Sequence, residues 1–341
     1  MTLISTGRDA VLALPVVADE CEETGIRDLR KWIQDTEGIP MFSEHTFCSA
    51  FLHVSKFEQQ EARDRIQRYW YSRKHAIMLH MNGLDPSSSG VLNILRGPHA
   101  VYFPLPGYDK DGRKVILARW NQLDVSGKSY TFEEWFQAIT LVFDTVCFLD
   151  PQARTHGITF LMDAKGVRLK HLLFFGFDNS CKQFTVMQKG YPIRIRQVHY
   201  VNNNRVIGFF LEVVKKVITT KLANRIQLHG YKYEKVFEYI DVTNMPSDYL
   251  GEGVITRSSK DIMEKFIQDQ ILQPDNLRFL RELYITEIPD VEPRTELLGR
   301  KDALSTEPEV DEKGIEVQFL AYSTEKISIK DEKEIGVCEF D

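Results

Sequence analysis

The first quarter of the chain shows the spacing of amphipathic helices, with apolar residues three and four positions apart. Three such stretches follow one another, at residues 19–35, 43–57 and 58–80. Ser43 stands at the start of the second stretch, where its hydroxyl suits an N-cap. These features predict a small three-helix bundle, which we assign to residues 19–85.

The pattern changes beyond residue 90, where short apolar runs alternate with stretches of helical spacing. The run at 157–163 is apolar on both faces, which is typical of a strand in a sheet covered on both sides. Strands alternating with helices predict an α/β layer fold, which we assign to residues 90–275. We expect strands at 99–104, 114–120, 157–163, 193–201 and 235–240, and helices near 131–149, 168–175, 179–189, 205–218, 220–228 and 258–270.

Charge is distributed unevenly along the chain. The net charge is −6, but residues 287–341 alone contain 16 acidic and 7 basic residues, so the remainder is mildly basic. The acidic segment also lacks clear periodicity, and we expect it to be a flexible C-terminal tail. The mildly basic remainder is compatible with anionic lipid. It is too weakly charged for duplex nucleic acid, so no nucleic-acid partner is expected.

Cysteine usage and hydropathy bear on the compartment. The five cysteines are scattered and form no CxxC pair, which favours a reducing environment over a disulfide framework. The apolar run at 11–18 is only eight residues long, too short to span a bilayer. We therefore expect a cytoplasmic protein.

Sequence signatures of common enzyme sites are missing. No GxxxxGK[ST] phosphate loop and no GxSxG nucleophile turn occurs. Gly251 and Gly253 begin like a dinucleotide fingerprint, but its third glycine is absent, so a plain turn is the better interpretation. His199 falls in a predicted strand, where a structural histidine is commoner than a catalytic base. We expect no enzymatic activity, no metal site and no cofactor.

Two features around residues 190–220 carry the functional signal. Arg194 and Arg196 alternate along a predicted strand and therefore point to one face. In the helix predicted at 205–218, polar side chains occupy a stripe of only about 100°, the reverse of an ordinary surface helix. Two interpretations stay open: a helix covered on most sides, or a lid over an apolar cavity that also touches lipid.

Lys221 and Arg225 are four residues apart, which places them on one face of the next predicted helix. With Arg194 and Arg196 they would form a basic patch suited to phosphate groups, because guanidinium forks bind phosphate in bidentate fashion. Scattered, solvated surface charge is the alternative interpretation of the same four residues.

The sequence resembles the CRAL-TRIO lipid-binding family, to which tocopherol and retinaldehyde carriers belong, over roughly residues 25–275. One departure is the run Asn202-Asn203-Asn204, where the family commonly has Asn-x-Pro and so a preset helix start. The resemblance implies an α/β sandwich with an internal apolar pocket, preceded by the helical module. It rests on separated motifs in the right order, which are His156-Gly157-Ile158, Asp163-Ala164-Lys165-Gly166, Tyr191-Pro192-Ile193-Arg194-Ile195-Arg196, His199, Asn202, Lys221, Arg225-Ile226 and His229-Gly230.

The resemblance also implies roles for individual residues. The four basic residues named above, Arg194, Arg196, Lys221 and Arg225, match positions at which the tocopherol carriers bind phosphoinositide headgroups. The helix at 205–218 would be a mobile gate, with apolar residues Val206, Phe209, Phe210, Val213, Val214 and Val217. The pocket wall that we expect consists of Thr140, Phe143, Ile158, Phe160, Met162, Phe175, Tyr191, Ile193, Val198 and Phe210.

These features together predict an intracellular, monomeric carrier that associates transiently with membranes. It would bind one hydrophobic ligand, such as a retinoid, a tocopherol or another lipid, in the apolar pocket. It would exchange that ligand at phosphoinositide-containing membranes. The alternative is a phosphoinositide-sensing adaptor without transfer activity.

Overall fold

We describe the protein from a computed structural model. The predicted acidic tail at 287–341 lies almost entirely outside the described residues. The structure describes residues 20–75, 81–175, 187–215, 218–250 and 256–289.

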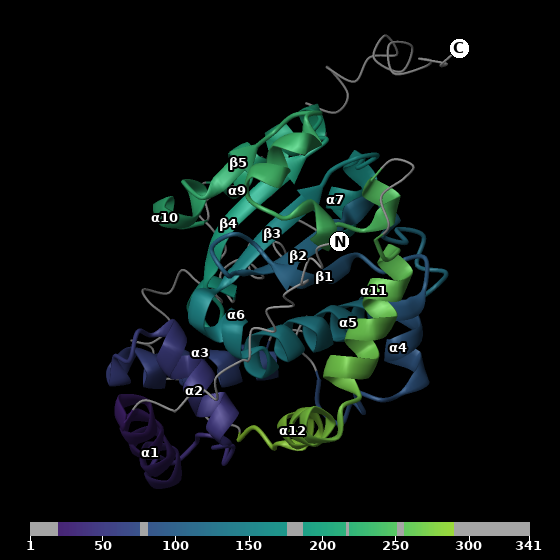
Figure 1. The fold of residues 1–341 in the computed structure, drawn as a ribbon. Coiled ribbons are helices and arrows are strands. Elements are labelled where there is room, and N and C mark those ends of the chain that lie inside the picture. The colour runs from purple at the N-terminus through teal and green to yellow at the C-terminus, as the bar shows by residue number, and fades with distance from the viewer. Residues whose placement is uncertain (1–19, 76–80, 176–186, 216–217, 251–255, 290–341) are drawn as a thin grey trace, which may run out of the picture.

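Three helices form the N-terminal part of the described chain: α1 (Glu20–Asp35), α2 (His45–Val54) and α3 (Gln59–His75) (Figure 1). The buried side chains of α1 recur every three or four residues, as its apolar spacing predicts. The three helices expected from the sequence are confirmed, the third as far as the described residues extend.

A five-stranded sheet in the order β1-β2-β3-β4-β5 forms the centre of the molecule (Figure 1). β1 pairs antiparallel with β2, and every other pair of neighbours is parallel. β1 and β5 are therefore the two edges, and β1 contains Pro104 and Pro106. The strands are β1 (Tyr102–Tyr108), β2 (Lys114–Arg119), β3 (Ile158–Asp163), β4 (Ile195–Val201) and β5 (Ile226–Leu228).

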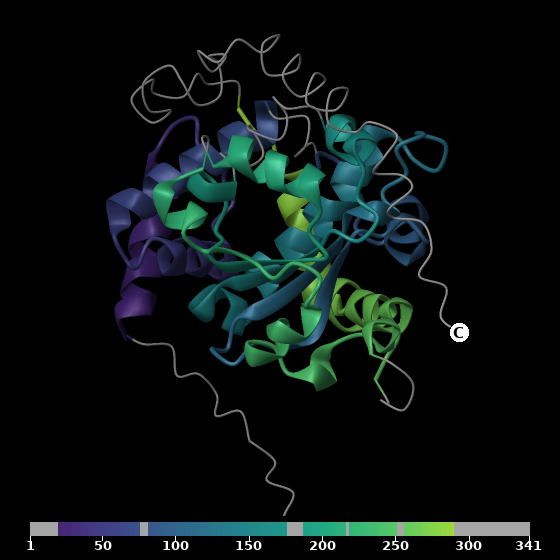
Figure 2. The ribbon, with the colours of Figure 1, turned by 90° about the horizontal axis from the view of Figure 1, so that it is seen from above.

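Helices surround this sheet, as the α/β prediction requires. The longest of them is α5 (Phe132–Asp144), which begins at a capping box between Thr131 and Glu134 and runs into a π-helical turn over Thr145–Leu149. Figure 2 shows the purple N-terminal helices at the left and the light-green α11 on the opposite side of the sheet. The remaining helices are α4 (Ser89–Arg96), α6 (Pro151–His156), α7 (Leu169–Phe175), α9 (Arg205–Val214), α10 (Thr220–Ala223), α11 (Ser259–Phe266) and α12 (Pro274–Ile285).

Aromatic rings join the N-terminal helices to the rest of the molecule. The ring of Phe279 in α12 lies 5.5 Å from Phe42 and 5.6 Å from Phe148, measured between centroids. Phe47 of α2 lies 5.6 Å from Phe148, which follows α5 in the chain. The helical module and the sheet therefore share one apolar core.

The strand predicted at 235–240 is wrong. This segment is a 3-10 helix over Tyr233–Glu238, and the amides of Tyr239 and Ile240 donate back to the Val236 carbonyl, both at 2.9 Å, instead of to a neighbouring strand. The fifth strand is β5, which falls inside the helix predicted at 220–228. Helices α4, α6 and α12 have no counterpart among the predicted elements. No described helix has the length and apolar character needed to cross a membrane.

Candidate functional site

The register of the sheet divides its side chains between two faces. Phe160 of β3 pairs with Ile116 of β2 and with Val198 of β4, so these three side chains point the same way. The ring of Phe143 in α5 lies 6.0 Å from that of Phe160. This side of the sheet, which we call the α5 face, is therefore the one covered by α5.

The α5 face is packed less completely than the opposite face. Phe160, Met162 and Val198 retain 8–9% exposure, although they lie in the central strands β3 and β4. Thr159 and His199 alternate with them along the same strands and are 0% exposed. Protein cores are normally close-packed, so this difference indicates looser packing around these three side chains.

Several predicted pocket residues lie on or beside the α5 face. Phe143 projects from α5, and Thr140 is buried one turn before it. Phe210 of α9 packs on Trp120, with ring centroids 5.7 Å apart, and Ile193 is buried just before β4 begins. Predicted residues on the α5 face of the strands are Ile158, Phe160, Met162 and Val198.

Tyr191 is placed elsewhere. Its hydroxyl donates a hydrogen bond to the carboxylate of Asp144, and its ring lies 5.7 Å from that of Tyr69 in α3. Tyr191 is therefore part of the junction with the N-terminal helices rather than of the pocket wall, because its polar end is satisfied there. The side chain of Phe175 lies outside the described residues.

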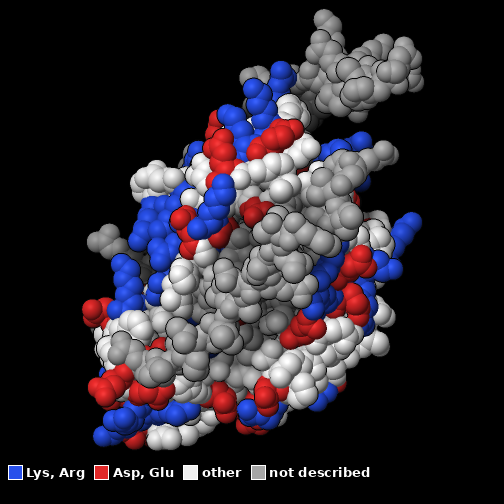
Figure 3. Space-filling model, viewed as in Figure 1, with Lys and Arg blue, Asp and Glu red and all other residues white. Residues whose placement is uncertain are grey.

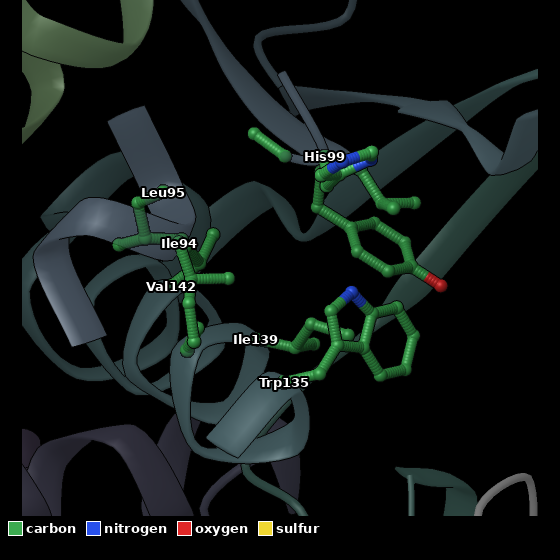
Figure 4. A pocket seen from close by; sticks show the side chains of 10 residues that line it. Ile94, Leu95, His99, Trp135, Ile139 and Val142 are labelled. Carbon is green, nitrogen blue, oxygen red and sulfur yellow. The ribbon is translucent and has the colours of Figure 1, made fainter. Parts of the chain in front are cut away.

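A small hollow lies between α4, α5 and the start of β1 (Figure 4). Figure 4 shows Ile94 and Leu95 of α4 on one side and Trp135 and Ile139 of α5 on the other. Its cavity volume is about 10 Å³, far below the usual size of a pocket for a drug-sized ligand. Its lining contains none of the ten residues predicted for the pocket wall; it consists of Ile94, Leu95, His99, Ala100, Val101, Tyr102, Trp135, Ala138, Ile139 and Val142.

Helix α9 corresponds to the predicted gate. Asn204, at the position where the family commonly has proline, caps the start of this helix. Its Oδ1 accepts a hydrogen bond from the Ile207 amide at 3.1 Å. Its Nδ2 donates to the Val167 carbonyl at 2.8 Å. The helix start is thus fixed both to the helix itself and to the segment after β3.

The apolar residues of α9 are not equally buried. Phe210 and Val214, together with Ile207 and Leu211, form the buried stripe, whereas Val206 and Phe209 are half-buried. The side chains of the other predicted gate residues, Val213 and Val217, lie outside the described part of the structure. The helix therefore has one well-packed face and a second, partly apolar flank.

A hydrogen-bond chain anchors the residues before α9. Asn202, which adopts a left-handed conformation with φ of 52°, donates from Nδ2 to Asp163 Oδ1 at 2.8 Å. The other oxygen of Asp163 accepts a hydrogen bond from the Tyr249 hydroxyl. The Arg119 guanidinium donates to that hydroxyl at 3.2 Å and pairs with Asp248. The entry to α9 is thereby tied to the carboxyl ends of β2 and β3.

The structure brings three of the four predicted basic residues together. Arg194 and Arg196 donate to the carbonyls of Thr155 and His156 at the end of α6, at 3.3 and 3.2 Å. Arg225 donates to the Ile195 carbonyl. Because these bonds go to backbone oxygens, no described carboxylate neutralises the three charges. Figure 3 shows Lys and Arg gathered at the left of the molecule, near α10 and the start of β4.

Arg196 lies close enough to Arg194 and Arg225 to influence their pKa values. Burial, followed by the nearby charge of Arg196, lowers the pKa of both Arg194 and Arg225. Arg65 of α3 contributes further to the shift at Arg194 and donates to the Tyr191 carbonyl at 3.2 Å. Lys221 is exposed on α10. The sequence did not indicate Arg65, because it reaches the site only through a contact between residues 126 positions apart.

Comparison with known proteins identifies the domain. The family model described as the CRAL/TRIO domain matches residues 99–251. The chain contains a CRAL/TRIO domain. This confirms the family resemblance and the α/β fold class drawn from the sequence. The match begins just before β1 and ends after the segment that contains Tyr249, so it covers the sheet, α5 and α9.

Curated relatives match beyond the CRAL/TRIO domain. The alpha-tocopherol transfer protein-like protein of Homo sapiens is 27% identical over 241 residues, which cover 66% of this chain and 66% of that protein. Clavesin-2 of Homo sapiens is 23% identical over 214 residues, with 61% and 62% coverage. A solved structure titled "Crystal structure of Sfh5" is 14% identical, with a TM-score of 0.44, and covers 74% of this chain and 99% of that one.

Proposed function

We propose that this protein binds one hydrophobic small molecule, such as a retinoid, a tocopherol or another lipid, between the α5 face of the sheet and helix α9. The incomplete packing of Phe160, Met162 and Val198 carries this proposal, because those side chains sit where a ligand would complete the core. A ligand that buries roughly 300 Å² of apolar surface would gain about 7 kcal/mol from burial alone, without charge pairing.

Exchange of the ligand at phosphoinositide-containing membranes is the second part of the proposal. It is supported by Arg194, Arg196 and Arg225, whose guanidinium groups have no described carboxylate partner. Each such cation near an anionic surface contributes about 1 kcal/mol. The partly apolar flank of α9, with Val206 and Phe209, supports a gate that meets the bilayer.

The remaining parts of the proposal concern its class and place. The name of one relative contains the words "transfer protein", which favours a carrier. We propose that the chain is not an enzyme, acts in the cytoplasm and meets membranes transiently. Among the described residues, no group of three or more His, Cys, Asp or Glu side chains is placed to hold a metal.

Native mass spectrometry of the purified full chain tests the carrier proposal. We expect one lipid per chain, released on unfolding. A chain that carries no lipid, takes up none from mixed-lipid vesicles and still binds phosphoinositide vesicles would support the adaptor alternative instead.

A vesicle-sedimentation experiment tests the basic patch. Arg194→Ala combined with Lys221→Ala should weaken binding to vesicles that contain phosphatidylinositol bisphosphate about 10- to 30-fold, since two surface cations are lost. The control removes two exposed cations elsewhere, Lys128→Ala with Lys260→Ala. Equal binding by both double variants would reject the patch, whatever the mass spectrometry shows.

A further inference from the structure

The basic patch, Arg194, Arg196, Lys221 and Arg225, has no ion pair with any carboxylate that the structure describes. It lies where Figure 3 shows Lys and Arg gathered, near α10 and the start of β4. Burial, followed by the charge of Arg196, lowers the pKa of both Arg194 and Arg225. Like charges held this close repel one another, so an anion among them would lower the free energy. The patch therefore favours a partner with several negative charges.

The same chain carries a polyanion in its sequence. Residues 307–316, with the sequence EPEVDEKGIE, contain five acidic side chains and one basic side chain, so their net charge is −4. We call them the acidic segment; they lie outside the described residues. Residues 290–306 are nearly neutral, with four acidic and three basic side chains, so the negative charge is concentrated in the acidic segment. Its charge is equal and opposite to that of the four cations of the basic patch.

The last described residues lie against the helix that borders the basic patch. Lys74, near the end of α3, donates from Nζ to the Pro289 carbonyl at 3.0 Å. Arg65 of the same helix donates to the Tyr191 carbonyl at 3.2 Å, three residues before Arg194. An α-helix rises 1.5 Å per residue, so α3 covers only about 14 Å between Arg65 and Lys74. Residues 290 onwards therefore leave the described structure close to the patch.

The length of the connection lets the acidic segment reach the patch. Seventeen residues separate Pro289 from Glu307. They can span up to about 55 Å, several times the rise of α3 between Arg65 and Lys74. A second acidic group, residues 331–341, also has five acidic side chains and one basic side chain, but 41 residues separate it from Pro289. Because a longer tether lowers the effective concentration of a linked group, the nearer acidic segment is the favoured partner.

We propose that the acidic segment binds the basic patch of its own chain and competes there with anionic lipid headgroups. The intramolecular contact rests on the charges of the patch, and only the competition rests on the proposed function. Physiological salt screens charges beyond about 8 Å, so the contact is weak and depends on the tether. The segment thereby masks the patch in solution, and a surface dense in anionic lipid displaces it.

Zero-length cross-linking tests the contact without a membrane. A carbodiimide joins a carboxylate to an amine that touches it, and Lys221 supplies an exposed amine in the patch. In the monomeric fraction of the full chain, peptide mass spectrometry should find Lys221 joined to the acidic segment. Lys128 and Lys260, exposed elsewhere, should react far less, and excess inositol trisphosphate should suppress the link to Lys221. Equal reaction of the three lysines, or links only between two chains, would overturn the proposal.

Vesicle sedimentation of full-length charge variants tests the competition. Neutralising the acidic segment should strengthen binding to vesicles that contain phosphatidylinositol bisphosphate about 3- to 10-fold. The matched control makes the same change in net charge within residues 331–341 and should strengthen binding less than about twofold. The first variant carries Glu307→Gln, Glu309→Gln, Asp311→Asn, Glu312→Gln and Glu316→Gln, and the control carries Asp331→Asn, Glu332→Gln, Glu334→Gln, Glu339→Gln and Asp341→Asn.

The two charge variants separate docking at the patch from general repulsion. Equal gains in both would show that only net charge matters and would overturn the competition. In a chain that also carries Arg194→Ala and Lys221→Ala, neutralising the acidic segment should change vesicle binding less than about twofold, because its binding site is lost. Absence of vesicle binding by every chain would contradict the membrane part of the proposed function, and the cross-link to Lys221 would then decide the intramolecular contact by itself.

Discussion

Arg73 and Asp144 form an ion pair that is sealed inside the molecule, with Nη1 and Oδ2 2.9 Å apart and side-chain exposures of 3% and 0%. Arg73 comes from α3 and Asp144 ends α5, so the pair links the N-terminal helices to the helix that covers the sheet. Asp144→Asn should lower the free energy of unfolding by about 3–5 kcal/mol, because it leaves a buried guanidinium without its counter-charge.

Urea denaturation measures this effect, and the exposed pair of Arg281 with Asp85 supplies the comparison. Arg281 Nε and Asp85 Oδ1 are 3.2 Å apart, but each side chain is about half exposed. Asp85→Asn should therefore cost less than about 1 kcal/mol. Similar losses in Asp144→Asn and Asp85→Asn would show that the buried pair contributes no more than a surface pair.

Gly157 is a position where the backbone leaves no room for a side chain. It has φ of 88°, and a Cβ there would collide with the Arg194 carbonyl, which accepts the hydrogen bond from Ile158 that joins β3 to β4. Gly83 has φ of 74° but open space around it. Gly83→Ala should cost about 1–2 kcal/mol for its conformation alone.

Gly157→Ala should cost clearly more than Gly83→Ala, and it should also weaken binding to phosphoinositide vesicles, because Arg194 is displaced. Thermal unfolding and vesicle sedimentation measure the two effects. Equal losses in the free energy of unfolding of both alanine variants would show that the close approach to Arg194 does not affect stability.

Asn204 should control how firmly α9 is held at its start. Asn204→Ala removes the cap and the bond to the Val167 carbonyl, and caps of this kind are worth about 1 kcal/mol. We expect faster amide hydrogen exchange within 205–214 and little change elsewhere. Asn224→Ala, at the exposed end of α10, is the control. Unchanged exchange in α9 would mean that neighbouring contacts alone hold its start.

The stability of the fold should depend on pH through His199. Burial, followed by the charge of His229, lowers the pKa of His199 from 6.5 to about 4. Between those values the unfolded chain binds a proton that the folded chain does not. The free energy of unfolding therefore decreases as the pH falls from about 6.5 to about 4, and this contribution is fully present only above that window.

Chemical denaturation at pH 7.5 and at pH 5 measures this dependence. The unaltered chain should lose more stability on acidification than His199→Gln, while His45→Gln, at an exposed site, should follow the unaltered chain. Equal losses of stability on acidification in all three chains would show that His199 does not contribute to the acid sensitivity. Burial also lowers the pKa of His229, so part of the dependence should survive in His199→Gln.

The fold was predictable from the sequence wherever local spacing decides the structure. The helices around Leu29 and Phe143 and the strand around Phe160 follow directly from their apolar periods. The edge strand β5 did not, because three residues contain too little pattern and only pairing with β4 makes them a strand. The segment around Val236 was misread because its apolar residues are too few to separate a short helix from a strand.

The candidate site was predictable to the same extent. Alternation placed Arg194 and Arg196 on one side, and both donate to the same end of α6. The sequence pattern did not indicate that Tyr191 contacts Asp144, since that contact depends on how the helical module docks. The composition of the α5 face likewise depends on register between strands, which aligns Tyr102 and Tyr200 in one row across the sheet although 98 residues separate them.

The two outer strands have a consequence for how copies of this protein meet. Pro104 and Pro106 remove two amide donors from β1, and β5 offers only three residues of exposed backbone. Neither strand presents a regular ladder of free hydrogen-bonding groups to a neighbouring molecule. The proposed carrier, whose apolar interior would open at a bilayer, thus has edge strands that are poor templates for pairing with a second copy.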